Sequence, residues 1–437
     1  MGGTDTGPVE KITITSDDYK TRLGYYKLIK KIGKNKYSAS VAEKYDVSGA
    51  DQGKRFLKFA QPSDTAYAQN LQDEAGFRMY HPFIEHIYGF HHAVDETGTQ
   101  WVVLEAEHVS ETTLHDFFAQ QRTDDEKFCC MMQLVEAVHY YVEYRQRNPY
   151  VHRDLKPKNI MIESKNKKFF RCVIVDFDSA HIPIEDDPGE TKHIGCLFYS
   201  LGYTPIEIPD QTQRTLSDIY SLGRIFCYIL KGTEYFTEAE HNEQEKALWL
   251  LRSGQQITDE EETDWFGLQS ERLCKKYKNE KYKGLLSIID KMTATQDKRY
   301  KNIGGSASTN GGVLYDLKQF FRSYYGEKYD DFLSKVFVET EEAAFLMEKD
   351  MGCPYTIFPY LENGEPLSQV KLKNYDVGEI YDEKKTILTL YRIGETIYYV
   401  PYDSQISWEK DTGFELTEDS GLSYGETKIT FQKQSYS

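Results

Sequence analysis

The chain has 437 residues, 39% of them hydrophobic, which is enough for a folded core and exceeds the length of most single domains. Acidic residues outnumber basic residues by 70 to 53, which argues against a nucleic-acid-binding protein because such proteins need a basic face. Seven cysteines without metal-ligand spacing predict buried free thiols, and the lack of a long apolar run predicts a soluble, cytoplasmic protein without an integral membrane segment.

Residues 1–24 are polar and rich in Gly, Thr and Asp, which predicts a flexible N-terminal tail. The first residues, MGGTDT, also fit the pattern for myristoylation of Gly2; a plain disordered terminus is the alternative, because no basic patch follows. From Tyr25 onward the short runs YKLIKKIG, YSASVAEKYDV and KRFLKFA, separated by turn residues, predict an antiparallel sheet. WVVLEAE at 101–107 predicts a further buried strand.

Helices are expected to dominate the middle of the chain. TDDEKFCCMMQLVEAVHYYVEYR places Glu126 three residues after Thr123, which is a capping box, and continues with apolar residues at helical spacing. NIMIESKNKKFFRCVIVDF predicts a hairpin, and TLSDIYSLGRIFCYILKG predicts a buried helix that is capped near Ser217 and ends at Gly232. Further helices are expected over about 240–255 and 281–293 and in VLYDLKQFFRSYY.

Beyond about residue 330 the pattern changes to short strands. TILTLYRIGETIYYVPYD predicts a strand, a turn and a strand, and QISWEK and ETKITFQK predict more strands. We therefore expect residues 333–437 to form a β-rich accessory domain. Its aromatic strands suit the binding of a regulatory or substrate partner, with an ordinary β core as the alternative interpretation.

The residues with the clearest chemistry lie in VHRDLKPKNIMI and VIVDFD. Asn159 leads into the first strand of the predicted hairpin and Asp176 ends the second, so that an amide oxygen lies beside a carboxylate. Mg²⁺ prefers such oxygen ligands, especially when substrate phosphates complete its shell. Asp154 can hold an attacking hydroxyl and accept its proton, and Lys156 can reach the transferred phosphoryl group. Together these groups predict phosphoryl transfer.

The order of these motifs resembles that of eukaryotic-type protein kinases over about residues 25–325. The resemblance implies an α+β, bilobal protein-kinase-like fold, with a small antiparallel β N-lobe over about 25–107 and a mainly α C-lobe over about 108–325. The small β-rich domain would follow at the C-terminus. ATP would be the phosphoryl donor and a protein the acceptor.

HRDLKPKN resembles the kinase catalytic loop. The resemblance makes Asp154 the catalytic base, Lys156 the companion typical of serine/threonine kinases, and Asn159 a metal ligand. DFD stands where kinases have DFG, so Asp176 would be the main ligand of Mg²⁺ or Mn²⁺. Asp178 replaces the glycine of that motif, and it is interpreted either as stiffening a conformational switch or as an ordinary turn residue.

Two upstream segments resemble the nucleotide site. RFLKFA resembles the third-strand segment whose lysine holds the α- and β-phosphates, which implies this role for Lys58. Glu74 is the candidate partner of Lys58, with Asp73 and Glu85 as substitutes, because Glu74 lies somewhat close to the following motif.

The glycine-rich loop and the hinge are also recognisable. IGKNKYSASV keeps Gly33, although asparagine and serine occupy the other two glycine positions and leave less room for backbone amides to approach phosphate. VLEAE resembles the hinge, which makes Leu104 the gatekeeper and places Glu105 and Ala106 beside the adenine.

Three downstream matches complete the resemblance. SDIYSLG resembles the helix that anchors the catalytic loop, through Asp218, and GYTPIE resembles the end of the activation segment, where Glu207 would pair with Arg299. Arg153 would bind a phosphorylated activation loop, with Thr191 as the candidate phosphosite, or would hydrogen-bond to loop carbonyls.

The sequence therefore predicts an ATP-dependent kinase that transfers the γ-phosphoryl group to Ser/Thr hydroxyls of proteins. A pseudokinase or scaffold that acts through nucleotide or partner binding is the alternative, because two loop glycines are missing. A small-molecule kinase of the aminoglycoside or choline type is a further alternative, because IVDFD resembles the metal-binding segment of those enzymes.

Overall fold

The structure of the chain is a computed structural model. It describes residues 11–32, 39–76, 81, 83–144, 151–166, 169–179, 200, 202–205, 214–232, 280–295, 297–305, 311–336, 359–361, 377–382, 385–393, 396–401, 414–417, 421–424 and 427–431. The chain divides into two compact units, residues 1–166 with 170–326 and residues 167–169 with 327–437. Gly2, the expected helix over 240–255 and the expected strand QISWEK lie outside the described residues.

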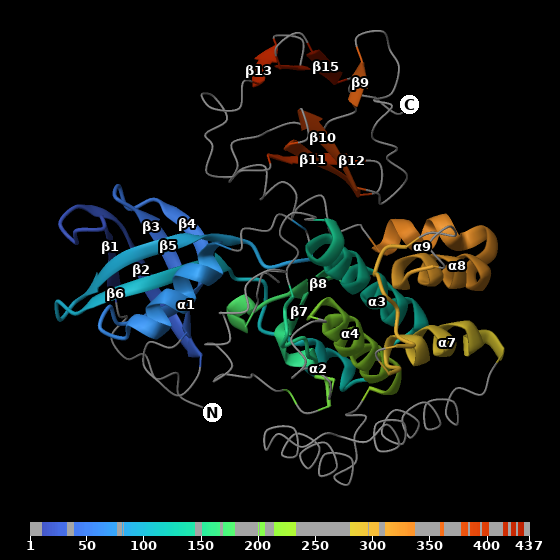
Figure 1. The fold of residues 1–437 in the computed structure, drawn as a ribbon. Coiled ribbons are helices and arrows are strands. Elements are labelled where there is room, and N and C mark those ends of the chain that lie inside the picture. Colours follow the sequence, from blue (N-terminus) through green and yellow to red (C-terminus); the bar gives the residue numbers. More distant parts are fainter. Residues whose placement is uncertain are drawn as a thin grey trace. The chain divides into compact units, whose positions relative to one another are not determined.

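The first unit begins with an antiparallel sheet (Figure 1). Its six strands are β1 (Lys11–Thr15), β2 (Arg22–Ile32), β3 (Ala39–Asp46), β4 (Asp51–Ala60), β5 (Ile87–Asp95) and β6 (Gln100–Glu107). Neighbouring strands pair in the order β2, β3, β4, β6, β5, and β1 pairs with both β2 and β5. A helix, α1 (Thr65–Gly76), connects β4 to β5.

Strand β1 corrects part of the flexible tail expected over residues 1–24, of which the structure describes residues 11–24. In KITIT the apolar residues Ile12 and Ile14 alternate with polar residues, and both are buried. This alternation is the pattern of a strand with one buried face. The five residues therefore add to the sheet instead of remaining in solvent.

Side chains along β4 and β6 alternate between two apolar cores, because successive side chains of a strand point to opposite faces. Leu57, Phe59 and Val103 pack with Ile12 and Tyr26 in one core. The residues in between face α1 in the second core; these are Ala60, Val102, Leu104 and Ala106, which pack with Leu71 and Ala75. This alternation decides which polar side chains of the two strands share a face.

The rest of the first unit is mainly helical (Figure 1). Its helices are α2 (Leu114–Phe118), α3 (Asp124–His139) with a π-helical turn (Tyr140–Tyr144), α4 (Arg214–Lys231), α7 (Lys283–Met292) and α8 (Val313–Tyr325). A hairpin of β7 (Ile160–Asn166) and β8 (Phe169–Ile174) lies between α3 and α4 in the chain. Single 3-10 turns cover Pro157–Asn159, Phe177–Ser179 and Glu280–Tyr282.

The ends of two helices test the sequence predictions. Thr123 and Glu126 form the predicted capping box at the start of α3. α4 begins at Arg214, so Ser217 is not the cap but is buried in the first turn. Gly232 ends α4 as predicted: its φ is +74°, and a Cβ atom there would lie 2.8 Å from the Phe118 carbonyl oxygen.

The second unit contains a 3-10 turn (Gly326–Lys328), whose first residue belongs to the first unit, and α9 (Tyr329–Val336). Its strands are β9 (Pro359–Leu361), β10 (Val377–Asp382), β11 (Lys385–Ile393), β12 (Thr396–Pro401), β13 (Phe414–Thr417), β14 (Gly421–Tyr424) and β15 (Thr427–Phe431). They form two sheets, β10-β11-β12 and β13-β14-β15-β9. TILTLYRIGETIYYVPYD accordingly forms the predicted pair of strands.

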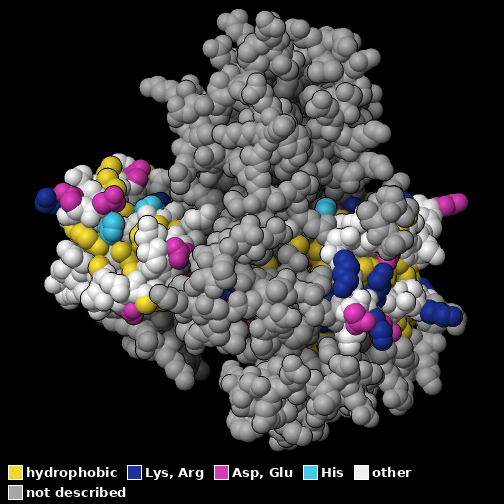
Figure 2. All heavy atoms as spheres, in the orientation of Figure 1, with side chains coloured by type: hydrophobic (Ala, Val, Ile, Leu, Met, Phe, Trp, Pro, Cys, Tyr) yellow, Lys and Arg dark blue, Asp and Glu magenta, His cyan; other side chains and the backbone are white. Residues whose placement is uncertain are grey.

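Within the described part of the chain, no helix is long and apolar enough to cross a membrane. Figure 2 shows acidic, basic and hydrophobic side chains interspersed over the described surface of one face. The net charge of −17 is therefore not gathered into a single acidic patch on the described residues of that face.

Candidate active site

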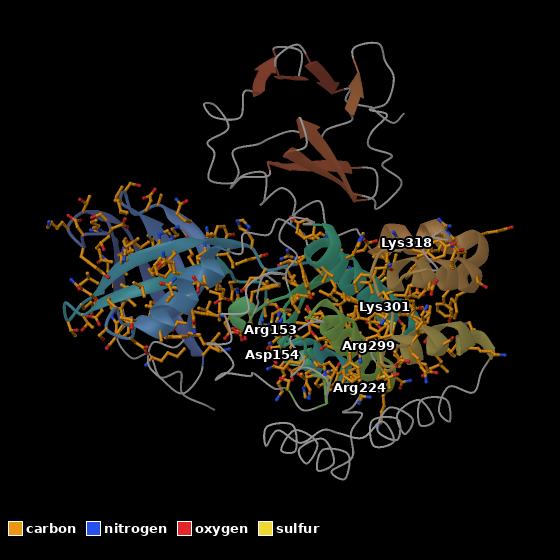
Figure 3. All side chains as sticks on the ribbon, viewed as in Figure 1. Arg153, Asp154, Arg224, Arg299, Lys301 and Lys318 are labelled. Atoms are coloured by element: carbon orange, nitrogen blue, oxygen red, sulfur yellow. The ribbon has the colours of Figure 1, made fainter. Side chains whose placement is uncertain are left out.

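The loop that carries Asp154 is held by a buried aspartate of α4. The backbone N–H groups of His152 and Arg153 donate to the two oxygens of Asp218, at 2.7 and 3.1 Å, and the Tyr141 hydroxyl donates to the same carboxylate at 3.2 Å. Burial raises the pKa of Asp218, and the neighbouring His152 opposes this rise. The anchoring that the sequence resemblance implied for Asp218 is therefore present. Figure 3 labels Arg153 and Asp154, the next two residues of this loop.

A hairpin brings Asn159 to the end of β8, where Asp176 lies. The Val175 N–H donates to the Asn159 carbonyl oxygen at 3.0 Å, so Asn159 pairs with the residue before Asp176. The Asn159 side-chain amide donates to the Asp154 carbonyl oxygen at 3.0 Å and to its carboxylate at 3.1 Å. Hydrogen bonds of Asn159 thus connect Asp154 to the residue before Asp176, so that the three predicted residues lie close together.

Lys58 connects the sheet to this segment. Its ammonium group contacts the Glu74 carboxylate at 2.8 and 3.0 Å and Asp176 Oδ1 at 2.6 Å. Glu74 is buried on the face of α1 that packs on the sheet, whereas Asp73 is exposed, because adjacent residues of a helix point in different directions. Of the candidate partners, Glu74 is therefore the one that pairs with Lys58.

The charges of this cluster shift one another's pKa values. Burial alone would lower the pKa of Lys58, but Glu74 and Asp176 raise it well above the ordinary value. Burial alone would raise the pKa of Asp176, but Lys58 lowers it. Burial raises the pKa of Glu74, and Lys58 opposes this rise. Lys58 and Asp176 are therefore both ionised at neutral pH.

Two residues of the site have left-handed backbone conformations. The φ angles of Arg153 and Asp176 are +67° and +71°. Residues with a Cβ atom rarely adopt this region, and surrounding contacts must hold them there. Such conformations are concentrated at functional sites, which is consistent with the position of both residues next to Asp154 and Lys58.

Ser200 is a member of the site that no sequence motif placed next to Asp154. Its hydroxyl donates to the Asp154 carboxylate, and Lys156 Nζ donates to the Ser200 hydroxyl at 3.1 Å and to Asp154 at 2.5 Å. Ser200 and Lys156 thus both lie against the predicted base. A serine 46 residues downstream of Asp154 has no local signal that would have identified this contact.

Glu105 does not join the Lys58 cluster. In the register of β4 and β6, Lys58 pairs with Leu104 and Leu57 pairs with Glu105, so the side chains of Lys58 and Glu105 point to opposite faces. Glu105 is 0% exposed and contacts Lys44 and Arg55, each at 2.8 Å. The side chain of Glu105 therefore lies on the face away from Lys58, and the position of this residue beside the adenine stays a prediction.

Leu104 and Ala106 do lie on the same face as Lys58, within the core against α1. All three residues of the predicted hinge are paired with both β4 and β5. Strand β6 ends at Glu107, whose carboxylate accepts a hydrogen bond from Arg171 of β8. The strand thus ends at the residue where the predicted strand over 101–107 ends.

The remaining predicted residues include some whose expected partners lie outside the described residues and some that themselves lie outside them. Arg299 donates to the Ala294 carbonyl oxygen at 2.9 and 3.1 Å and lies over the Tyr220 ring. Its expected partner Glu207 lies outside the described residues, as do Gly33 and Thr191. Asp178 is exposed in the 3-10 turn Phe177–Ser179.

The donor set at the end of β8 fits a magnesium ion that also binds phosphates. Asp176 supplies a carboxylate and Asn159 an amide, both oxygen donors of the kind that Mg²⁺ selects. Among the described residues no group of three or more His, Cys, Asp or Glu side chains forms a metal site. This agrees with the way Mg²⁺ is usually bound, by one or two protein oxygens together with substrate phosphates and water.

A comparison with protein families matches this chain to one of them. The model of the protein kinase domain matches residues 26–300, which is well over half of the chain. The match includes Lys58, Glu74, Asp154, Asn159 and Asp176, and it ends at Tyr300, before α8.

Individual relatives are more distant. The Aurora kinase of Debaryomyces hansenii is 24% identical over 231 residues, which cover 52% of this chain and 52% of that protein. Death-associated protein kinase 2 of Homo sapiens is 27% identical over 216 residues, which cover 48% and 56%. A probable serine/threonine-protein kinase KIN1 homolog of Enterocytozoon bieneusi is 26% identical over 223 residues, which cover 50% and 34%. The similarity spans about half the length of the first two relatives and a third of the last.

Proposed function

This chain belongs to the protein kinase family, and from this premise we propose that it transfers the γ-phosphoryl group of ATP to Ser or Thr hydroxyls of protein substrates. The observation that carries the proposal is the connected set of ionic contacts from Glu74 through Lys58 to Asp176. Asn159 and Asp154 lie beside that set through the β7–β8 hairpin. These contacts bring side chains from α1, from β4 and from the end of β8 together at one lysine.

Asp154 would hold the acceptor hydroxyl and take its proton. The hydroxyl oxygen would form a bond to the γ-phosphorus while the bond to the β,γ-bridging oxygen breaks, so that ADP leaves with the electron pair. The contact between the Ser200 hydroxyl and Asp154 supports this role, because it demonstrates that the carboxylate can accept a hydrogen bond from an alcohol at this position. Lys156 would stay next to the transferred group and offset its charge.

Lys58 would bind the α- and β-phosphates, and its pairing with Glu74 holds it in place. Asp176 and Asn159 would hold Mg²⁺, which would neutralise phosphate charge. The lowered pKa of Asp176 supports this assignment, because it keeps the carboxylate ionised at neutral pH. Ala106 and the residues after β6 would border the adenine, and Gly33 would lie over the phosphates.

Serine/threonine preference is proposed on two grounds. Lys156 follows Asp154 by two residues, and Ser200 contacts both of them. The name of one relative given above, the probable serine/threonine-protein kinase KIN1 homolog, points in the same direction at an identity of 26%.

The test uses the purified full-length chain with Mg²⁺ and γ-labelled ATP, offered mixed proteins and Ser-, Thr- and Tyr-containing peptides. We expect autophosphorylation or substrate phosphorylation on Ser and Thr, identified by mass spectrometry. Asp154→Asn should reduce the rate by at least about 100-fold, because a positioned base contributes about 10²- to 10⁴-fold.

Asp73→Asn is the matched control, because this exposed acid lies next to Glu74 but outside the ionic set. It should leave the rate within about twofold of the wild-type rate, as expected for an exposed surface change. Nucleotide binding without any transfer would support the scaffold alternative instead. Transfer to choline or an aminoglycoside, but to no protein, would support a small-molecule kinase.

A further inference from the structure

A second buried acid, Glu85, contacts the segment that carries Asp176. Glu85 lies in the connection between α1 and β5, and this connection pairs with the end of β8. The Glu85 N–H donates to the Ile174 carbonyl oxygen at 2.8 Å, and the Ile174 N–H donates to the Phe83 carbonyl oxygen at 2.9 Å. These hydrogen bonds hold the backbone of Glu85 beside Ile174, which lies two residues before Asp176 in the chain.

Glu85 is a buried acid that is flanked in the chain by buried apolar residues. Its neighbours Phe83, Ile84 and Ile87 are buried, and Glu85 itself is only 5% exposed. A carboxyl group removed from water is unfavourable unless it is hydrogen-bonded. The partner that the structure provides is the backbone N–H of Asp176, which donates to Glu85 Oε2 at 3.3 Å.

That backbone N–H belongs to a residue in a strained conformation. With φ at +71°, Asp176 must be held by its neighbours. Lys58 holds its carboxylate from β4, and Glu85 holds its peptide group from the connection before β5. The two contacts come from different elements: one holds the side-chain carboxylate of Asp176 and the other holds its backbone N–H.

We propose that Glu85 is a positioning residue: by accepting a hydrogen bond from the Asp176 peptide, it orients the Asp176 carboxylate for a phosphate-bound divalent cation. The proposal rests on the proposed function in one respect, namely that Asp176 holds the cation. It extends that function to a residue whose role lies in the second layer around the metal, where such partners commonly determine metal affinity.

The role depends on an acceptor oxygen and not on a charge. Burial raises the pKa of Glu85 to about 8. A protonated carboxyl group still has an oxygen that accepts, so the hydrogen bond to Asp176 forms in both protonation states. The amide oxygen of glutamine can replace this acceptor at nearly the same length, whereas leucine fills the space and offers no acceptor.

The experiment compares wild-type full-length protein with Glu85→Gln, Glu85→Leu and a control, Glu96→Leu, which changes an exposed acid in the β5–β6 turn. The first readout is the Mg²⁺ concentration that half-saturates the binding of a fluorescent N-methylanthraniloyl-ADP. The second is the KM for Mg·ATP together with kcat, and the third is the unfolding temperature. Should leucine prevent folding, Glu85→Met provides an unbranched apolar side chain of similar length.

We expect Glu85→Leu to raise the half-saturating Mg²⁺ concentration by about 10- to 100-fold, as for other partners of metal ligands. Glu85→Gln should stay within about threefold of wild type. The unfolding temperature of the leucine variant should change little, because burial of the apolar side chain offsets the hydrogen bond lost to the Asp176 N–H. Glu96→Leu should change neither binding nor turnover.

Two results would overturn the positioning role: unchanged Mg²⁺ dependence in Glu85→Leu, or an equal loss in Glu85→Gln, which would indicate a requirement for charge. The proposed function fails separately. If the wild-type protein binds Mg·ADP but transfers no phosphoryl group, the proposed function is wrong. The role of Glu85 is then still tested by the Mg²⁺ dependence of nucleotide binding. If wild-type nucleotide binding does not respond to Mg²⁺ at all, both proposals fall.

Discussion

Two buried ion clusters lie on opposite faces of the strands β4 and β6. Lys58 contacts Glu74 and Asp176 on one face, and Glu105 contacts Lys44 and Arg55 on the other. Both have contacts below 3 Å and shifted pKa values, so burial and ion pairing alone do not distinguish an active site from a structural cluster. The difference lies in where the members come from and in the balance of their charges.

The Lys58 cluster joins distant parts of the chain and has too few cations. Lys58 meets Glu74 from α1 and Asp176, which lies 118 residues away in sequence, and Glu85 lies close by. The single ammonium group of Lys58 thus faces two carboxylates, those of Glu74 and Asp176. An excess of this kind favours the binding of a further cation, which suits a site for Mg²⁺ and phosphates.

The Glu105 cluster lies within one sheet and has cations in excess. Its members come from neighbouring strands, and Tyr26 and His91 also contact the carboxylate at 2.8 Å. Burial alone would raise the pKa of Glu105, but His91 and Lys44 lower it to about 2. This cluster therefore stabilises the packing of the sheet, and the following changes test the contrast between the two.

The largest expected effect is on catalysis, in Lys58→Met. The change removes the group that would bind the α- and β-phosphates, and we expect phosphoryl transfer to fall by about 10²- to 10³-fold, the usual range for one electrostatic contact to the reacting groups. The change also leaves Glu74, which is 1% exposed, without its ion-pair partner, so we expect stability to fall as well, whereas Asp176 is 36% exposed and can be solvated by water. Labelled-ATP transfer and thermal unfolding measure the two.

Lys54→Met is the control for this variant, because Lys54 is exposed on the same strand. It should change neither quantity appreciably. A Lys58→Met protein that keeps full activity would remove the functional distinction between the two clusters.

Glu105→Leu should show the opposite pattern. It leaves Lys44 and Arg55 without their buried partner, and breaking a buried ion pair in this way typically lowers stability by about 3–5 kcal/mol. The KM for Mg·ATP should stay within about twofold, because the side chain points away from Lys58. Denaturant unfolding measures the stability and steady-state kinetics measure the KM. A raised KM without a loss of stability would indicate that Glu105 belongs to the nucleotide site.

The Glu105 cluster should also contribute to acid sensitivity. The pKa of Glu105 is lowered from 4.5 to about 2 in the folded state, so its contribution is present above about pH 4.5 and is lost as pH falls toward 2. The shift corresponds to about 3 kcal/mol. Unfolding free energies measured between pH 5 and 2.5 should therefore fall more steeply in wild type than in Glu105→Gln, and parallel curves would contradict the assignment.

The smallest effect is expected for Tyr26→Phe. The variant removes one hydrogen bond to the Glu105 carboxylate and keeps both cations, so stability should fall by about 1–2 kcal/mol. Tyr25→Phe on the same strand, whose ring stacks on Tyr45, should change stability by less than about 0.5 kcal/mol. Equal effects of the two variants in chemical denaturation would mean that the cluster contributes nothing beyond packing.

Local patterns were sufficient for much of the fold and for the core of the candidate site. The capping box at Thr123, the β7–β8 hairpin and the end of α4 at Gly232 are each determined by residues a few positions apart, and all are present. The residues Asp154 and Asn159 are adjacent for the same reason, since they share one loop.

The chain by itself therefore determined which residues carry charge or chemistry and in which order they occur. Only the tertiary structure decided their partners. The register of β4 and β6 turned Glu105 away from Lys58, the orientation of α1 selected Glu74 over Asp73, and the pairing of distant segments brought Ser200 to Asp154 and Glu85 to Asp176. A one-residue shift reverses the face of a strand residue, and no short-range pattern encodes contacts between elements that meet only on folding.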